Sequence, residues 1–204
     1  MKTLILAAIR CSLMFTAVTA SLFSIRAAEA YTVTLQQMGA NVVANGSGAF
    51  NLTGLSFLAS GTQGGAILQP PIGAIVTGTT DSANVTFFSG FSGPTSFGSG
   101  NGDIASSGSG DRVGIVGLFG QLSVPDGYVS GAALLSSATW NNATFASLGV
   151  TPGTYVWSWG TGLPNQNFTL IIIGGAGVPD AGSTISLLGF GLLGLAALRR
   201  RLGC

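Results

Sequence analysis

The sequence predicts an all-β fold, one antiparallel β-sandwich over residues 31–175. Short segments rich in Thr, Val, Phe and Ile recur along this range, and Gly, Asn, Ser and Pro lie between them. No sustained helical period interrupts the pattern. Strands that recur at this spacing, with turn residues between them, are typical of a jelly-roll-like or Ig-like sandwich.

The first predicted strands form a hairpin. Polar and apolar residues alternate over residues 31–35, a short apolar segment follows at 41–44, and a third segment covers 48–53. The pair Asn45-Gly46 lies between the second and third segments, and Asn-Gly is a strong signal for a tight turn. Further strands are predicted over 72–77, 84–89, 112–119, 128–135, 138–145, 154–159 and 167–173.

Three connections between these strands have distinctive compositions. Residues 91–111 are rich in Gly and Ser, which predicts a long mobile loop, either functional or merely slack. One helical turn is predicted over 143–148. After the turn at Pro152-Gly153, alternate positions place three aromatic residues on one strand face, as at the corner of a sandwich. These residues are Tyr155, Trp157 and Trp159.

The predicted body carries little charge. Four aspartates and one arginine give residues 31–175 a net charge of −3: Asp81, Asp103, Asp111, Asp126 and Arg112. Proteins that bind nucleic acids neutralise phosphates with clustered Lys and Arg. A body with one arginine and no lysine has no such cluster, so nucleic acid is not an expected partner.

The composition also excludes most enzyme chemistry. Residues 31–175 contain no His, Cys, Lys or Glu, and the two cysteines, Cys11 and Cys204, lie outside this range. Catalytic triads with histidine, thiol nucleophiles, lysine Schiff bases and glutamate pairs are therefore excluded. Catalysis by aspartates alone would require two of the four to meet in one cleft. We expect a protein that is not an enzyme and has no cofactor.

One loop offers oxygen atoms of the kind that calcium prefers. Asn101 and Asp103 lie close to Asp111 in a glycine-rich segment, and carboxylate and amide oxygens suit this ion. Their spacing matches no established calcium loop. We therefore interpret Asp103 and Asp111 as surface residues at strand ends, and predict no metal ligand.

Three tryptophans are candidates for glycan contact. Trp140, Trp157 and Trp159, with Tyr128 and Tyr155, could form a platform on which sugar rings stack. Large aromatic residues more often pack inside a sandwich core. Core packing is therefore the main interpretation, and a glycan site is the alternative.

The first 30 residues predict a signal peptide. Lys2 and Arg10 form a basic start, and an apolar stretch from Cys11 to Ile25 follows. Residues 28–30, Ala-Glu-Ala, have small residues at the two positions that signal peptidases require. We predict cleavage after Ala30, and cleavage after Ala20 is the alternative.

Residues 178–204 form a tail of three parts. A short motif, Val178-Pro179-Asp180-Ala181-Gly182, precedes an apolar stretch over 183–198, and Arg199, Arg200 and Arg201 follow. The stretch is at the short end of what a transmembrane helix requires. Arginines resist translocation and stay in the cytoplasm, so they act as a membrane stop and place the body outside.

This tail resembles the PEP-CTERM class of sorting signals, and most closely the VPDSG-CTERM variant of Gram-negative bacteria. Val178, Pro179, Asp180, Gly182 and the arginine cluster carry the resemblance, whereas Ala181 stands where that variant has Ser. The resemblance implies that an exosortase, an integral-membrane transpeptidase resembling cysteine proteases, recognises the motif and separates the tail. The chain would then be the substrate of that enzyme.

Together these features predict an exported surface or extracellular-matrix protein. It would be anchored transiently in the inner membrane of a Gram-negative bacterium and then cleaved, to remain in the cell envelope or outside the cell. The alternative is a carbohydrate-binding module of the envelope or of the exopolysaccharide, with the tryptophans as contacts. Its expected partners are the exosortase, the membrane and, for the alternative, exopolysaccharide.

Overall fold

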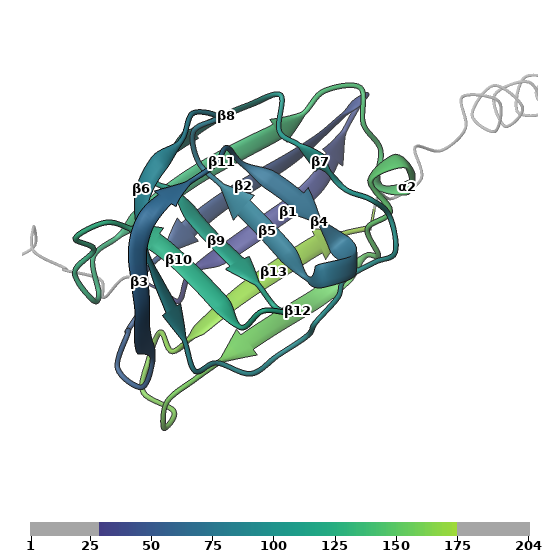
Figure 1. Ribbon diagram of the computed structural model, residues 1–204. Coiled ribbons are helices and arrows are strands. Elements are labelled where there is room, and N and C mark those ends of the chain that lie inside the picture. The colour runs from purple at the N-terminus through teal and green to yellow at the C-terminus, as the bar shows by residue number, and fades with distance from the viewer. Residues whose placement is uncertain (1–28, 175–204) are drawn as a thin grey trace, which may run out of the picture.

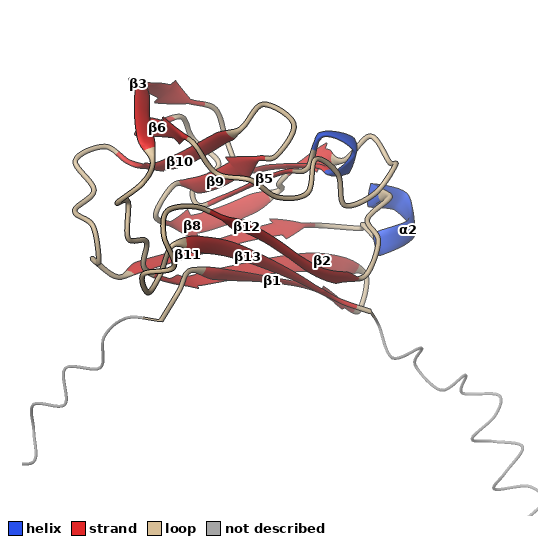
Figure 2. Cartoon of the chain, turned by 90° about the horizontal axis from the view of Figure 1, so that it is seen from below, coloured by secondary structure: helices blue, strands red, loops and turns tan. Residues whose placement is uncertain are grey.

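The computed structural model describes residues 29–174, which fold as two β-sheets packed face to face (Figures 1 and 2). This confirms the predicted all-β sandwich. Most of the predicted signal peptide, the sorting motif and the arginine cluster lie outside the described residues.

One sheet has six strands and contains both ends of the body. Its order is β12 (Gly153–Ser158), β13 (Asn167–Ile173), β1 (Thr32–Met38), β2 (Asn41–Gly48), β11 (Leu134–Trp140) and β8 (Ser107–Gly110). All neighbours are antiparallel except β1 and β13, which run parallel. The prediction of a purely antiparallel sandwich is wrong at this pair. The two strands come from opposite ends of the body, so no tight turn dictates their relative direction.

The other sheet has seven strands. Its order is β3 (Ser56–Gln63), β6 (Ala83–Ser89), β10 (Gln121–Pro125), β9 (Val113–Val116), β5 (Ala74–Thr77), β4 (Ile67–Gln69) and β7 (Asp103–Ile104). A short 3-10 helix, η2 (Pro70–Ile72), joins β4 to β5. Ig domains have about seven to nine strands and jelly rolls about eight, so this sandwich has more strands than either.

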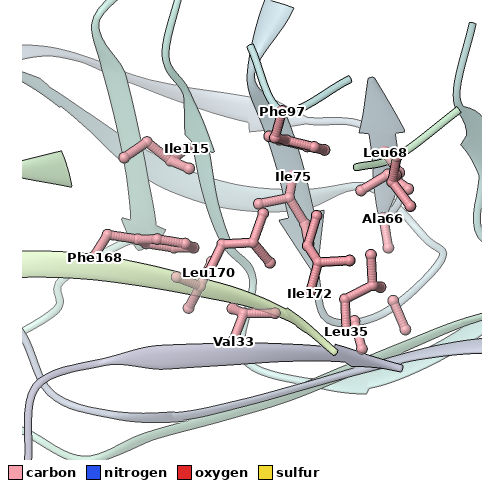
Figure 3. Close-up of a cluster of buried hydrophobic side chains, with 14 of the residues drawn as sticks. Val33, Leu35, Ala66, Leu68, Ile75, Phe97, Ile115, Phe168, Leu170 and Ile172 are labelled. Carbon is pink, nitrogen blue, oxygen red and sulfur yellow. The ribbon is translucent and has the colours of Figure 1, made fainter. Parts of the chain in front are cut away.

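The core lies between the sheets and follows the alternation of side chains along each strand. In β1, Val33 and Leu35 are buried and their neighbours are not. In β13, burial alternates in the same way, and the buried residues are Phe168, Leu170 and Ile172. Figure 3 shows these side chains meeting Leu68, Ile75 and Ile115 from the opposite sheet. Because all these strands lie within residues 29–174, the body has a core of its own.

The predicted helical turn is confirmed as α2 (Phe145–Leu148). Thr144 caps its first turn, since its hydroxyl accepts a hydrogen bond from the Ser147 amide at 3.0 Å, and Ser147 Oγ accepts one from the Thr144 amide at 2.8 Å. Gly149 ends the helix with a φ of 66°. A capping box and a left-handed glycine explain how four residues hold a helical turn.

The predicted turn at Asn45-Gly46 is wrong, because both residues lie inside β2. The β1–β2 hairpin closes instead at Gly39 and Ala40, where Met38 pairs with Asn41. Gly39 has a φ of 61°, which suits the first position of a tight hairpin turn.

Gly46 has a packing role in place of a turn role. A Cβ atom at Gly46 would lie 2.2 Å from the Tyr31 hydroxyl oxygen and 2.6 Å from Ser136 Oγ. Tyr31 is fully buried, and its hydroxyl group lies over β2 only because residue 46 has no side chain.

We therefore expect Gly46→Ala to lower the free energy of unfolding by roughly 2 kcal/mol, the usual cost of overpacking a core. Gly61→Ala is the matched control, since Gly61 also lies in a strand and its added Cβ would have no atom within 4 Å. Urea unfolding of both variants measures the difference. Equal stabilities would show that the Tyr31 side chain moves away at little cost.

The predicted mobile loop over 91–111 is also wrong. Phe97 is buried in the core, Ser92 and Gly98 form β-bridges with Ser158 and Val150, and β7 and β8 both lie in this segment. A Cβ at Gly98 would lie 2.0 Å from the carbonyl oxygen of Gly149. The glycines of residues 91–111 permit this segment to pack closely against the body. A glycine-rich composition therefore does not by itself indicate a mobile loop.

Other strand predictions are right in part. The predicted strand 112–119 is β9 followed by a tight loop, and 128–135 contributes only the start of β11. In the predicted strand 48–53 only Gly48 lies in a strand, as the last residue of β2, whereas β3, β4 and β10 lie where none was predicted.

Candidate functional site

The three tryptophans proposed as glycan contacts lie in the core. Trp140, Trp157 and Trp159 are 1%, 0% and 6% exposed. Each indole N–H donates to a main-chain oxygen, at 3.0, 2.7 and 2.8 Å respectively; the acceptors are Asp103, Pro94 and Asn51. Satisfied N–H groups and covered rings are typical of core tryptophans. The structure therefore supports core packing over a sugar-stacking platform.

The predicted sandwich corner is present beside these rings. Tyr155 and Trp157 lie on the inner face of β12, and the Tyr155 hydroxyl donates to the Thr151 carbonyl at 3.0 Å. This bond to a residue four positions earlier resembles the tyrosine corner of other sandwiches. Trp159 also borders a polar surface hollow of about 430 Å³, lined by Gly90, Phe91, Ser92, Ser158 and Gly160.

The aspartates are held by different elements. Asp103 and Asp111 accept hydrogen bonds from the amides of Ile104 and Leu135, at 2.7 and 2.8 Å. Asp126 accepts one from the Thr86 hydroxyl at 3.0 Å. Within residues 29–174, no three His, Cys, Asp or Glu side chains gather as metal ligands would. The geometry assigns no calcium site to Asp103 and Asp111.

The one arginine of the body is buried. Arg112 is 3% exposed, and its Nη2 donates to the carbonyl oxygens of Thr79 and Asp81, the latter at 2.5 Å. Burial lowers the pKa of the guanidinium, and Asp81 opposes this change. Arg112 thus holds the β5–β6 loop and offers no cationic surface to a ligand.

A buried chain of hydroxyl groups joins the two sheets. The Tyr31 hydroxyl lies 2.5 Å from Ser136 Oγ, which lies 2.6 Å from Thr77 Oγ1. Burial raises the pKa of Tyr31 to about 12, although its hydrogen bonds favour ionisation. A phenol that stays protonated is a structural link and not a base. Sequence reasoning missed these hydroxyl groups, because Tyr31, Thr77 and Ser136 lie far apart along the polypeptide.

The N-terminal and C-terminal residues of the body leave the six-stranded sheet at opposite ends of its strands. Since β1 and β13 are parallel and adjacent, the start of β1 and the end of β13 lie a strand length apart. Before β1, the Glu29 carbonyl accepts from the Ala49 amide at 2.8 Å, and the Tyr31 amide donates to Ala49 at 3.2 Å. The predicted cleavage point, Ala30, therefore lies within main-chain pairing of the folded body.

At the other end, β13 stops at Ile173, four residues before position 177. Within residues 29–174, no helix is long and apolar enough to cross a membrane. The predicted transmembrane helix belongs to the tail, beyond the part of the chain that the structure describes.

The comparisons with known proteins address that tail. No curated protein and no solved structure matches the chain. A family model does match, over residues 177–202, and it is described as the VPDSG-CTERM motif. A sorting motif of this kind indicates export and association with the cell envelope. The match includes all five residues of the predicted motif and the three arginines, so the chain carries a C-terminal VPDSG-CTERM motif.

Proposed function

We propose that this chain is a non-enzymatic surface or extracellular-matrix protein of a Gram-negative bacterium. Its tail anchors it transiently in the inner membrane, and an exosortase cleaves it near Val178 to Gly182. The body then remains as a weakly charged module in the envelope or outside the cell.

One observation carries this proposal: the VPDSG-CTERM match begins at residue 177, directly after the body has completed its last strand. β13 lies between β12 and β1 inside the six-stranded sheet, so the body needs no residue of the tail to finish its core. Cleavage in the motif would therefore release an intact domain. We expect the motif to be open to a protease, because a residue before a proline disfavours the helical conformation.

The chemistry of the body supports a non-enzymatic role. The aspartates are bound by separate elements, and the one arginine is used to hold a loop. The tryptophans are covered, so they give no support to a carbohydrate-binding module.

The intact mass of the protein tests the proposal, in cells that contain the exosortase and in cells that lack it. We expect the tail to be absent in the first and retained through Cys204 in the second. Asp180→Ala should block its removal, whereas Gly175→Ala, outside the matched residues, should not. Replacing Arg199, Arg200 and Arg201 should mislocate the protein without unfolding its body, because the membrane stop is lost.

Retention of the tail to the same extent in both kinds of cell would overturn the proposal. The chain would then be a permanently anchored membrane protein.

A further inference from the structure

A two-sheet sandwich has four edge strands, and three of them are protected here. β7 has two residues and β8 has four, so neither offers a long edge. The edge of β12 is paired at its end, where Ser92 and Ser158 exchange two main-chain hydrogen bonds of 2.9 Å. Short length and cover are two ways in which proteins prevent edge strands from pairing with other chains.

The fourth edge strand, β3, has neither protection. It is eight residues long, and its side chains are exposed from Ser56 to Thr62. Its one neighbour is β6, and no main-chain hydrogen bond within residues 29–174 joins its outer side to another segment. It also lacks proline and charged residues, which commonly guard such edges. A β-bulge, another such guard, lies only between Phe57 and Ala59, and residues 59–63 pair regularly with β6.

The inner face of this edge is apolar and uncovered. Phe57 pairs with Phe88, Phe88 with Leu122, and Leu122 with Ile115, so the four side chains form one row across the seven-stranded sheet. Leu122 and Ile115 are fully buried, whereas Phe57 is 64% exposed. Figure 2 shows why: β3 and β6 stand clear of the six-stranded sheet, so the core row continues beyond its cover.

We propose that β3 is an association edge, where two copies of this chain pair antiparallel about a two-fold axis. The pairing would continue the seven-stranded sheet, with the apolar row that ends at Phe57, into the second copy. This inference concerns the folded body alone and does not depend on the sorting of the tail.

A second copy fits this edge better than a charged partner does. Neither β3 nor β6 carries a charged side chain, so no like charges lie directly opposite one another when two copies pair along β3. The carboxylate of Asp126 lies beyond β6, where it accepts a hydrogen bond from Thr86. A charged partner would find no opposite charge on either strand. Antiparallel pairing about a two-fold axis perpendicular to the sheet places a residue opposite its own copy, which at the middle of β3 is Ala59 opposite Ala59. One strand pair buries less area than a stable dimer needs, so association should be weak and concentration-dependent.

The test is sedimentation equilibrium of the full chain in detergent and of the fragment 29–174, which contains all thirteen strands. We expect a monomer–dimer equilibrium in both. Ala59→Lys and Ala59→Glu should each raise the dissociation constant by about tenfold, because the pairing brings like charges together. An equimolar mixture of the two variants should restore association, since Lys then meets Glu.

The controls place the same charges on another strand. Ser47 is an exposed residue of β2, in the middle of the other sheet. Ser47→Lys and Ser47→Glu should therefore leave the dissociation constant unchanged. A wild-type fragment that stays monomeric up to about 1 mM would overturn the proposal. So would association that the Ala59 and Ser47 variants weaken equally, or that the mixture of Ala59 variants does not restore.

Discussion

Replacing Trp157 with alanine is expected to lower the free energy of unfolding by about 3–5 kcal/mol, the usual cost of removing a large aromatic side chain from a core. Trp157 is fully buried and packs edge-on against Phe168, with their ring centres 5.7 Å apart. Gly93 lies against its indole ring, where an added Cβ would be 2.6 Å from Cδ1. The cavity left by the indole cannot close easily, because β13 lies on one side of β12 and the main chain at Gly93 lies against the ring.

Chemical unfolding followed by circular dichroism measures this loss. Val156→Ala is the matched control, because Val156 is the preceding residue of the same strand but is 44% exposed on the outer face. That change should cost well under about 1 kcal/mol. Equal losses for the two variants would mean that the Trp157 ring contributes no core packing, and would reopen the question of a surface role.

The architecture could be predicted from the sequence where local patterns decide it. Alternation over residues 31–35 indicated a strand, which is β1 with one buried face, and a helical turn was predicted over 143–148, where α2 lies. The prediction of a turn at Asn45-Gly46 was wrong because a glycine that permits a tight turn also permits close packing. Only the position of Tyr31 distinguishes the two uses, and that position depends on pairing between distant strands.

The sorting motif could be predicted from the sequence, whereas the open edge of the body could not. The motif is a continuous string from Val178 to Gly182, so the sequence alone reveals it. By contrast, the open edge of β3 depends on how far one sheet extends beyond the other. Its residues, Ser56 to Gln63, were not predicted as a strand because Gly, Ser and Thr outnumber large apolar residues there.

Raising the pH from 10 to 12 is expected to lower the free energy of unfolding by about 2 kcal/mol through Tyr31 alone. The pKa of this phenol is about 10 in the unfolded chain and about 12 in the folded protein, because burial disfavours the charged form. The unfolded state therefore loses its proton first. This contribution to stability is fully present well below pH 10, falls by at most about 1.4 kcal/mol for each pH unit between pH 10 and 12, and is lost above pH 12.

Urea unfolding at intervals between pH 9 and 12, with the wild type and Tyr31→Phe, measures this slope. The variant should lose about 0.5–1.5 kcal/mol at neutral pH, because the bond to Ser136 is gone. It should also lose less stability than the wild type as the pH rises, since phenylalanine has no proton to release. A residual slope is expected from Tyr128, whose pKa burial also raises. If both proteins show the same slope, the Tyr31 hydroxyl is not buried in the folded protein, and the hydroxyl chain between the sheets does not form.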